Sequence, residues 1–171
     1  MSSSADEVAF TAWARARQPA LLRSAYLLTL DHARAEDLVQ EVLVKVARRW
    51  ARFRDDPPDA YARTILVHDN VSWWRKHRRE RPIGVLPELV DTGGIDRSER
   101  AMLLHQALGT LTAKQRAVLV LRYYDDLTEA QTADALGVGV GTVKSQAHAA
   151  LHRLRAEAPW LAELISEEAS R

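Results

Sequence analysis

The sequence has no cysteine in its 171 residues. A disulfide framework and any zinc or redox site built on thiolates are therefore excluded, and a reducing compartment, the cytoplasm, is expected. The sequence also lacks an apolar run near the roughly 20 residues that a helix needs to cross a bilayer. Its first residues, MSSSADEVAF, do not have the basic start and apolar stretch of a secretory signal. We expect no membrane insertion.

An excess of charge of one sign is also missing. The chain carries 24 Lys and Arg against 23 Asp and Glu, a formal net charge of +1. Charge as a whole therefore gives no sign of nucleic-acid binding, and any basic surface must be local. Hydrophobic residues make up 47% of the chain, which is enough for helical cores and too much for general disorder.

Helical periodicity runs along most of the chain, and no β alternation survives counting. We therefore predict an all-α fold. Residues 81–97 contain prolines and glycines with weak periodicity and are expected to form a flexible linker. The prediction is two small helical domains, residues 8–80 and residues 98–158, with Ser98 as the N-cap of the second.

Three residues predict helix boundaries in the first domain. Pro19 is expected to break a helix or to start one, because proline is costly inside a helix. Asp31 is a candidate N-cap for a helix from residue 33 to about residue 50. Asp59 is a candidate N-cap for the helix after that.

The helix expected over residues 33–50 has two different faces. Its apolar stripe consists of Leu38, Val39, Val42, Leu43, Val46 and Trp50. Its acidic and amide face carries Glu36, Asp37, Gln40 and Glu41. Alone, such a face is usually only solvated. In a chain that also carries the basic and DNA-binding features described next, it becomes a candidate docking face for a basic partner protein.

A basic, aromatic segment supplies the local positive charge. It follows a polar triplet, His68, Asp69 and Asn70, and consists of Trp73, Trp74, Arg75, Lys76, His77, Arg78, Arg79 and Arg81. Aromatic rings stack on unpaired bases and cations follow the phosphates, which is typical of contact with single-stranded or melted DNA. The alternative is that the tryptophans are core residues and the arginines are merely solvated. Adjacent helical residues cannot share a face, so at least one tryptophan is expected in the core.

Residues 127–154 predict a helix-turn-helix. Thr128 and Gln131 have the spacing of a capping box, and Gly137 stands where the first helix must end with a positive φ. The second helix, from about Val140, has an apolar face made of Val143, Ala147, Ala150, Leu151 and Leu154. Its polar face carries Thr142, Lys144, Ser145, His148 and His152. Short and basic side chains suit a helix that enters the DNA major groove, and the alternative is a solvated face on an ordinary helical hairpin.

No catalytic or cofactor site is predicted. The sequence shows no serine, histidine and carboxylate grouping with a nucleophile elbow. Gly137, Gly139 and Gly141 follow a helix rather than a strand, which excludes a dinucleotide loop. His148 and His152 stand one helical turn apart, as metal ligands can, but no cysteine or intervening glutamate supports a metal site.

Together these motifs resemble the extracytoplasmic-function sigma factors, the minimal two-domain initiation subunits of bacterial RNA polymerase, and among them an actinobacterial sigma-E-like subfamily. AEDLVQEVLVKVARRW is similar to the family's polymerase-binding helix, ILVHDNVSWWRKHRR to its promoter-melting segment, and the helix-turn-helix to its fourth region. The resemblance covers about residues 10–155. Three motifs in the family's order are far more specific than any one of them.

The resemblance implies a protein that is not an enzyme and carries no cofactor. It implies binding to core RNA polymerase, through the coiled coil of the largest subunit and the flap, and to promoter DNA. An anti-sigma factor is a further candidate partner. The domain of residues 8–80 would be sigma region 2 and that of residues 98–158 sigma region 4.

The resemblance also implies roles for single residues. Polymerase docking falls to Asp37, Gln40 and Glu41. Minus-ten recognition and melting fall to a base-capturing loop around residues 68–70 and the helix end after it, and the residues are His68, Asp69, Asn70, Trp73, Trp74, Arg75, Lys76, Arg78 and Arg79. Minus-thirty-five recognition falls to Arg122, Thr142, Lys144, Ser145 and His148.

Two residues depart from the family pattern. Family members often have asparagine at the position of His68, which puts the preferred minus-ten base in doubt. They often have serine at the position of Gly139, where it caps the recognition helix. Two rival functions stay open on the residues alone: a stand-alone helix-turn-helix regulator that works without polymerase, and a metal-dependent nucleic-acid enzyme that uses His148 and His152.

Overall fold

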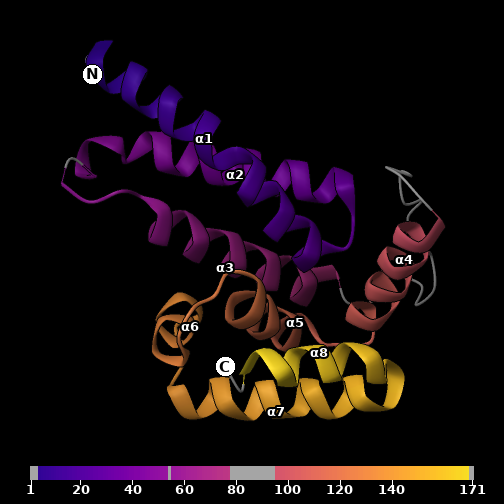
Figure 1. Cartoon of the computed structure of the whole chain (residues 1–171). Helices are drawn as coiled ribbons and strands as arrows, with labels where there is room; N and C mark the ends of the chain where they lie inside the picture. Colours follow the sequence, from indigo (N-terminus) through magenta and orange to yellow (C-terminus); the bar gives the residue numbers. More distant parts are fainter. Residues whose placement is uncertain (1–3, 54, 78–94, 170–171) are drawn as a thin grey trace.

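A computed structural model describes residues 4–53, 55–77 and 95–169. Over these residues the chain is helical and contains no strand, as the sequence predicts (Figure 1). The elements are α1 Ser4–Thr29, α2 His32–Arg48, η1 Trp50–Arg52, α3 Asp59–His77, α4 Ile95–Gly109, α5 Ala113–Leu119, η2 Val120–Tyr124, α6 Glu129–Leu136, α7 Val140–Glu157 and α8 Pro159–Ala169. Helices α1 to α3 form an N-terminal half, and α4 to α8 form a C-terminal half.

Helix α1 does not break at Pro19. It continues from Ser4 to Thr29 with Pro19 inside it, so the sequence-based prediction of a break was wrong. Proline removes one backbone donor, but Pro19 lies on the exposed side of the helix, where water can satisfy the carbonyl left without a partner. The buried residues near the end of the helix, among them Ala25 and Leu28 at 0% exposure, hold it against its neighbours.

Helix α2 begins where the sequence predicts. The Asp31 carboxylate accepts a hydrogen bond from the Arg34 amide at 2.8 Å, which satisfies one of the free donors of the first turn. Four members of the predicted stripe are fully buried, namely Leu38, Val39, Val42 and Val46, whereas Leu43 and Trp50 are half-buried. A fully buried aliphatic side chain of this size contributes about 1.5–3 kcal/mol. Trp50 lies beyond the helix, in the short 3-10 turn η1.

Helix α3 differs from its prediction at the start. Asp59 is the first residue of the helix and not its cap. Its carboxylate instead reaches across to α1, where it accepts from Trp13 Nε1 at 3.3 Å and pairs with Arg17 Nε at 2.6 Å. Asp59 therefore joins α3 to α1.

The C-terminal half begins earlier than predicted. Helix α4 starts at Ile95, so Ser98 lies inside it and is not an N-cap, and residues 95–97 of the predicted linker are helical. The rest of the linker lies outside the described residues. Pro159 follows the end of α7 and begins α8. This helix packs through Ala162 on a cluster with Leu154 and Ala150 of α7.

The two halves are in contact and share a core. One hydrophobic cluster contains the buried residues of α1, α2 and α3 together with Ala117, Val120, Leu121, Leu127 and Ala135 of the C-terminal half. In Figure 1 helices α5 and α6 lie directly beneath α3. The prediction of two helical domains did not include this contact.

The turn between α1 and α2 is a second place where the halves meet. Leu30 has a positive φ of 58°, which is costly for a residue with a Cβ, by roughly 1–2 kcal/mol. Its side chain is buried in a cluster with Leu108 of α4, which offsets that cost. His105 of α4, itself buried, donates from Nε2 to the Leu30 carbonyl at 2.9 Å.

Among the described residues, no helix is both long enough and apolar enough to cross a membrane.

Candidate nucleic-acid interface

The first helix of the helix-turn-helix, α6, is held at both ends by the residues that the sequence singled out. The Thr128 hydroxyl accepts from the Gln131 amide at 3.1 Å, and the Gln131 side-chain oxygen accepts from the Thr128 amide at 2.9 Å. This is the predicted capping box. At the other end Gly137 has a φ of 64°, and the Val138 amide donates to the Ala133 carbonyl at 3.0 Å. The turn is specified locally.

Close packing sets the angle between α6 and the recognition helix α7. Ala133 is 4% exposed and lies in a small cluster with Val118 of α5 and Val143 of α7. A larger side chain at Ala133 would push the two helices apart. Val143, Ala150 and Leu154 bury one face of α7, as predicted.

The opposite face of α7 is open to solvent. All five of its predicted polar residues are exposed, namely Thr142, Lys144, Ser145, His148 and His152. Lys144 Nζ lies 3.6 Å from a Glu129 carboxylate oxygen on α6, and the Ser145 hydroxyl donates to the Thr142 carbonyl at 3.0 Å. The helix therefore presents short polar and basic groups on a rigid support.

Arg122 lies apart from this face. It belongs to the π-helical turn η2, is half-buried, and donates from Nη1 to the Leu127 carbonyl. Its guanidinium also lies over the Tyr123 ring, with Cζ 5.6 Å from the ring centroid, which is within the reach of about 6 Å of a cation–π contact. In this arrangement Arg122 holds the backbone that leads into α6.

Residues 68–70 are helical. The resemblance implies a loop here, but α3 runs through this triplet to His77 without a break, so the expectation of a loop was wrong. Asn70 is 0% exposed and donates to the Leu28 carbonyl at 3.4 Å, so it faces the core in this conformation. Asp69 pairs with Lys45 of α2 at 2.5 Å. His68 is the exposed member of the triplet.

The two tryptophans at the end of α3 are both half-buried. Arg34 lies 5.1 Å over the Trp73 ring, and His77 stacks on that ring at 4.6 Å. Trp74 points to the C-terminal half, where Arg116 of α5 lies over its ring at 5.1 Å.

The basic residues that follow are only partly described. Arg75 and Lys76 are exposed in the last turn of α3. Arg78, Arg79 and Arg81 lie outside the described residues. The described residues therefore include only the first two Lys and Arg side chains of the predicted basic segment.

The acidic face of α2 is exposed as predicted, at Glu36, Asp37, Gln40 and Glu41. Arg34 Nη1 pairs with Glu41 at 3.4 Å. Val44, on the same helix, is 48% exposed. The face therefore combines negative charge with one exposed apolar side chain.

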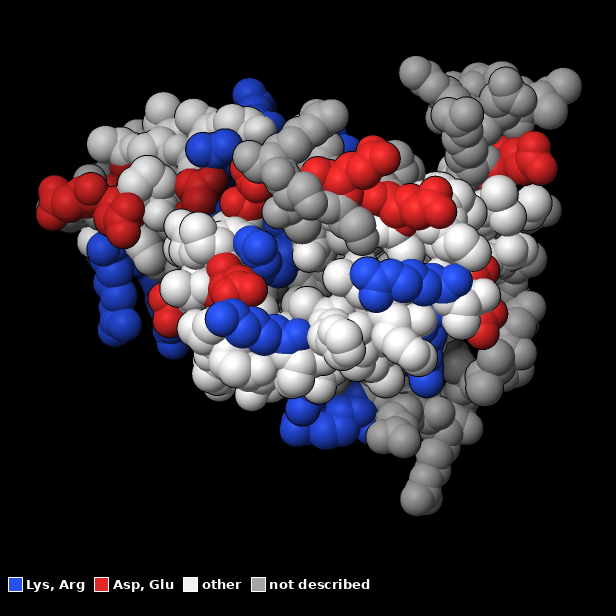
Figure 2. All heavy atoms as spheres, turned by 60° about the horizontal axis from the view of Figure 1, so that its bottom comes forward, with Lys and Arg blue, Asp and Glu red and all other residues white. Residues whose placement is uncertain are grey.

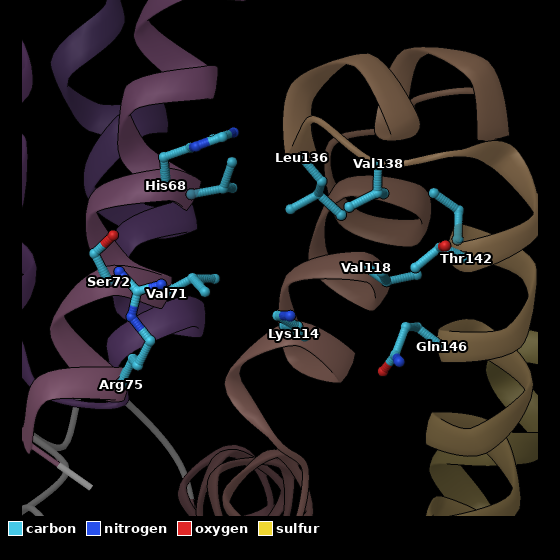
Figure 3. A pocket seen from close by; sticks show the side chains of 12 residues that line it. His68, Val71, Ser72, Arg75, Lys114, Val118, Leu136, Val138, Thr142 and Gln146 are labelled. Carbon is cyan, nitrogen blue, oxygen red and sulfur yellow. The ribbon is translucent and has the colours of Figure 1, made fainter.

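A cavity of about 160 Å³ lies between α3 and the helix-turn-helix (Figure 3). His68 and Arg75 line it from α3, and Thr142 and Gln146 line it from α7. Gln146 was not predicted as a site residue, although its position one turn after Thr142 places it on the same side of the helix. The cavity brings the predicted minus-ten and minus-thirty-five residues to one place.

Charges of both signs are interspersed over the face that α7 helps to form (Figure 2). The basic side chains do not gather into one uniform patch there. A small net charge of +1 agrees with this distribution. Unaided attraction to DNA depends mainly on the number of phosphates that cations neutralise, so this face offers few such contacts.

Within the described residues no group of three or more His, Cys, Asp or Glu side chains could hold a metal ion. His148 and His152 are exposed neighbours on α7 without a third ligand of that kind.

The helical fold and the helix-turn-helix define a class of DNA-binding transcription proteins, and comparison with known families places the chain within it. The chain belongs to the sigma-70 family, as one of its extracytoplasmic-function sigma factors: the family's region 2 matches residues 13–80 and its region 4 matches residues 101–154.

Several known proteins are similar over most of their length. The RNA polymerase sigma-E factor of Streptomyces coelicolor is 41% identical over 151 residues, which cover 86% of this chain and 85% of that protein. The sigma factor SigL of Mycobacterium tuberculosis is 33% identical over 142 residues, with 79% and 80% covered.

A solved structure has a similar fold. It is the sigma factor RpoE from Bartonella quintana in complex with the anti-sigma factor NepR, and it superposes with a TM-score of 0.69. The sequence identity is 27%, and the match covers 88% of this chain and 97% of that chain.

Proposed function

We propose that this chain is a promoter-recognition subunit that binds core RNA polymerase and directs the initiation of transcription. The observation that carries the proposal is the exposed polar face of α7, fixed on a buried opposite face within a chain of the sigma family. The chain would supply no catalytic group of its own and would act in the cytoplasm. We assign residues 8–80 to region 2 and residues 98–158 to region 4.

Recognition of the minus-thirty-five element is assigned to α7. Lys144 and His148 would reach base edges or phosphates in the major groove, with Thr142 and Ser145 near the start of the helix. Arg122, through its bond to the Leu127 carbonyl, would position the entry to α6 and approach the DNA from beside the recognition helix.

Recognition and melting of the minus-ten element are assigned to the last half of α3 and the basic residues after it. His68, Trp73, Trp74, Arg75 and Lys76 present rings and cations along one helix, which suits a displaced single strand. Asp69 would need to leave Lys45, and Asn70 would need to leave Leu28, before either could touch a base. Extruding a base costs a few kcal/mol, which contacts in a pocket must repay.

Polymerase is an integral part of this proposal. The α7 face carries charges of both signs, which gives it little attraction to DNA on its own. This favours a chain that polymerase holds on DNA over a regulator that binds DNA alone. Asp37, Gln40 and Glu41 on α2 are the proposed docking residues for the coiled coil of the largest subunit, and region 4 would meet the flap. By analogy with the RpoE complex, an anti-sigma factor is a further candidate partner.

A titration of the labelled full-length chain with core RNA polymerase tests the docking face. Replacing both Asp37 and Glu41 with alanine should weaken binding about tenfold, which corresponds to about 1.4 kcal/mol. The matched control is the double variant Glu157→Ala and Glu163→Ala, which removes the same charge from exposed positions far along the chain. Equal affinities for the two double variants would remove the acidic face from docking.

A further inference from the structure

The cavity between α3 and the helix-turn-helix has walls that are largely apolar. Three of its lining residues, Val67, Val118 and Val143, are at most 1% exposed. Three more apolar side chains complete the walls, namely Val71, Leu136 and Val138. Figure 3 shows the side chains of α3 on one side of this space and those of the helix-turn-helix on the other. An apolar group that covers these walls removes their surface from water, which is favourable.

The size of the cavity limits what can enter it. Its volume is about 160 Å³. An apolar cavity of about 150 Å³ takes up a molecule the size of benzene, whereas sites for drug-sized ligands hold roughly 300–1,000 Å³. Gly137 closes in from one side, because a Cβ built on this residue would lie 3.5 Å from Cε1 of His68. The apolar part of a ligand is therefore limited to one small ring or a short branched chain.

Positive charge lines the cavity without negative charge beside it. Arg75 of α3 and Lys114 of α5 are lining residues, and both are exposed. No Asp or Glu is among the described residues that line the cavity, and no ion pair within the described part of the chain involves either cation. One exposed cation contributes little to binding, but two at one cavity attract an anion and repel a cation.

We propose that this cavity binds a small amphipathic anion, an aromatic or branched-chain carboxylate. Its apolar group would lie among the buried valines, and its carboxylate would face Arg75 and Lys114. Ser72 and Gln146, which also line the cavity, supply further hydrogen-bond donors. Lys114 has no part in the promoter contacts assigned above, and binding of the anion to the free chain does not depend on the proposed function.

A bound anion would lie among residues that the proposed function assigns to promoter DNA. His68 and Arg75 belong to the proposed minus-ten contacts, and Thr142 belongs to the proposed minus-thirty-five contacts. All three line the cavity. We therefore expect the anion and promoter DNA to exclude each other, and this consequence rests on the proposed function.

An NMR titration of the isotope-labelled full-length chain with sodium benzoate tests the site. Amide signals near Val71, Lys114 and Thr142 should shift and saturate with a dissociation constant of about 1 mM, as expected for a ligand with few atoms. The ionic strength is held constant with sodium chloride. An absence of saturable shifts up to about ten times that concentration would overturn the site, as would shifts confined to other helices.

Two matched ligands separate the apolar part of the site from its charge. Acetate keeps the carboxylate without the ring, and benzyl alcohol keeps the ring without the charge. Each should bind at least about fivefold more weakly than benzoate. Acetate that binds as tightly as benzoate would contradict the apolar part of the site. Benzyl alcohol that binds as tightly would contradict the role of the two cations.

Substitutions at the cavity test the same two parts from the protein side. Lys114→Gln and Arg75→Gln should each weaken benzoate binding about two- to fivefold, the range for an exposed ion pair. The matched control is Arg155→Gln, which removes the same charge from an exposed position of α7 that does not line the cavity. Benzoate affinities that neither charge variant lowers relative to this control would overturn the proposal.

Val138→Phe should place a ring in the cavity and abolish benzoate binding. Val138 is 37% exposed, so this change falls at the edge of the cavity. Full benzoate affinity in a folded Val138→Phe chain would place the ligand elsewhere. If this variant loses its helical circular dichroism, the two charge variants decide the matter.

Transcription in vitro with core RNA polymerase separates the site from its consequence. Transcription that depends on the chain should fall as benzoate approaches saturation, and Lys114→Gln should move this fall to benzoate concentrations about two- to fivefold higher. Constant transcription at benzoate concentrations that saturate the chain would overturn the exclusion of promoter DNA. If no form of the chain supports transcription, the proposed function is contradicted, while the NMR titration still decides whether the cavity binds the anion.

Discussion

Gly139 begins the recognition helix without a side-chain cap. It has the extended backbone of an N-cap, with φ −75° and ψ 155°, but supplies no acceptor to the first turn of α7. No atom lies within 4 Å of a Cβ built at this position, so a side chain fits. Glycine at this position therefore costs α7 one capping hydrogen bond and leaves the backbone geometry of an N-cap intact.

Replacing Gly139 with serine should stabilise the chain by about 0.5–1 kcal/mol, through the new cap and the smaller entropy of the unfolded chain. The expected rise in melting temperature is about 1–4 °C, measured by circular dichroism. Gly139→Ala is the control, because it gives the entropic part without an acceptor. A serine variant no more stable than the alanine variant would show that the cap does not form.

Asp125 should make stability depend on pH. Burial is the larger influence and raises the pKa of its carboxyl, against the lowering effects of Ser24 and Arg63. The folded chain therefore holds this proton more tightly than the unfolded chain. The Asp125 carboxyl therefore adds to the free energy of unfolding at low pH. This addition is lost as the pH rises from the ordinary aspartate pKa of about 3.9 through the raised pKa of the folded chain.

Asp125→Asn removes this titration and keeps an oxygen that can accept from Ser24. The variant should gain stability relative to the unmodified sequence as the pH rises from about 4 to about 7, measured by urea unfolding at each pH. Asp126→Asn provides the comparison at an exposed neighbour. Identical pH profiles for the two variants would mean that burial of Asp125 carries no net cost.

At the scale of the element, two glycines of the helix-turn-helix should respond in opposite ways to the same change. Gly137→Ala places a Cβ on a backbone with φ 64° and should cost about 1–2 kcal/mol. Gly141→Ala lies within the first turns of α7 with open space around it, and should stabilise by about 0.5–1 kcal/mol. Urea unfolding of both variants measures the difference. Equal signs would contradict the assignment of the turn.

The helix-turn-helix could be predicted from the sequence because its signals are local. Thr128 with Gln131 closes a capping box within four residues, and Gly137 ends the same helix through its own backbone. Asp31 at the start of α2 is a similar case. The helix break predicted at Pro19 was wrong because the cost of a proline inside a helix depends on whether it faces water. Packing of α1 against other helices decides which side that is.

The roles assigned to Asn70 and Asp59 also depended on distant parts of the chain. Asn70 belongs to a polar triplet in the sequence, but its side chain meets the Leu28 carbonyl, 42 residues away. Asp59 has the character of a cap, but Trp13 and Arg17 engage its carboxylate. Local patterns contain no information about such partners. The sequence roles of exposed residues such as Lys144 and His148 stay predictions, since the structure places them on the expected face without DNA.

At the scale of the whole molecule, two helical regions could be predicted, but their contact could not. The residues that join them, such as Ser24 with Asp125, are separated by 101 positions. No pattern in the sequence predicts that a serine in α1 bonds to an aspartate in a turn. The shared core around Leu121 and Leu127 is likewise seen only once the helices are assembled.

Transcription in vitro with core RNA polymerase over a randomised promoter library tests the central claim most directly. We predict transcripts that depend on the added chain, from promoters that share one upstream and one downstream element. With Lys144→Ala the downstream element should persist. If Lys144 reads a base, the upstream element should lose its preference at one position, at a cost of about 1–3 kcal/mol in binding free energy. Transcription that the chain does not stimulate, or that selects no shared elements, would contradict the proposal that it is a promoter-recognition subunit.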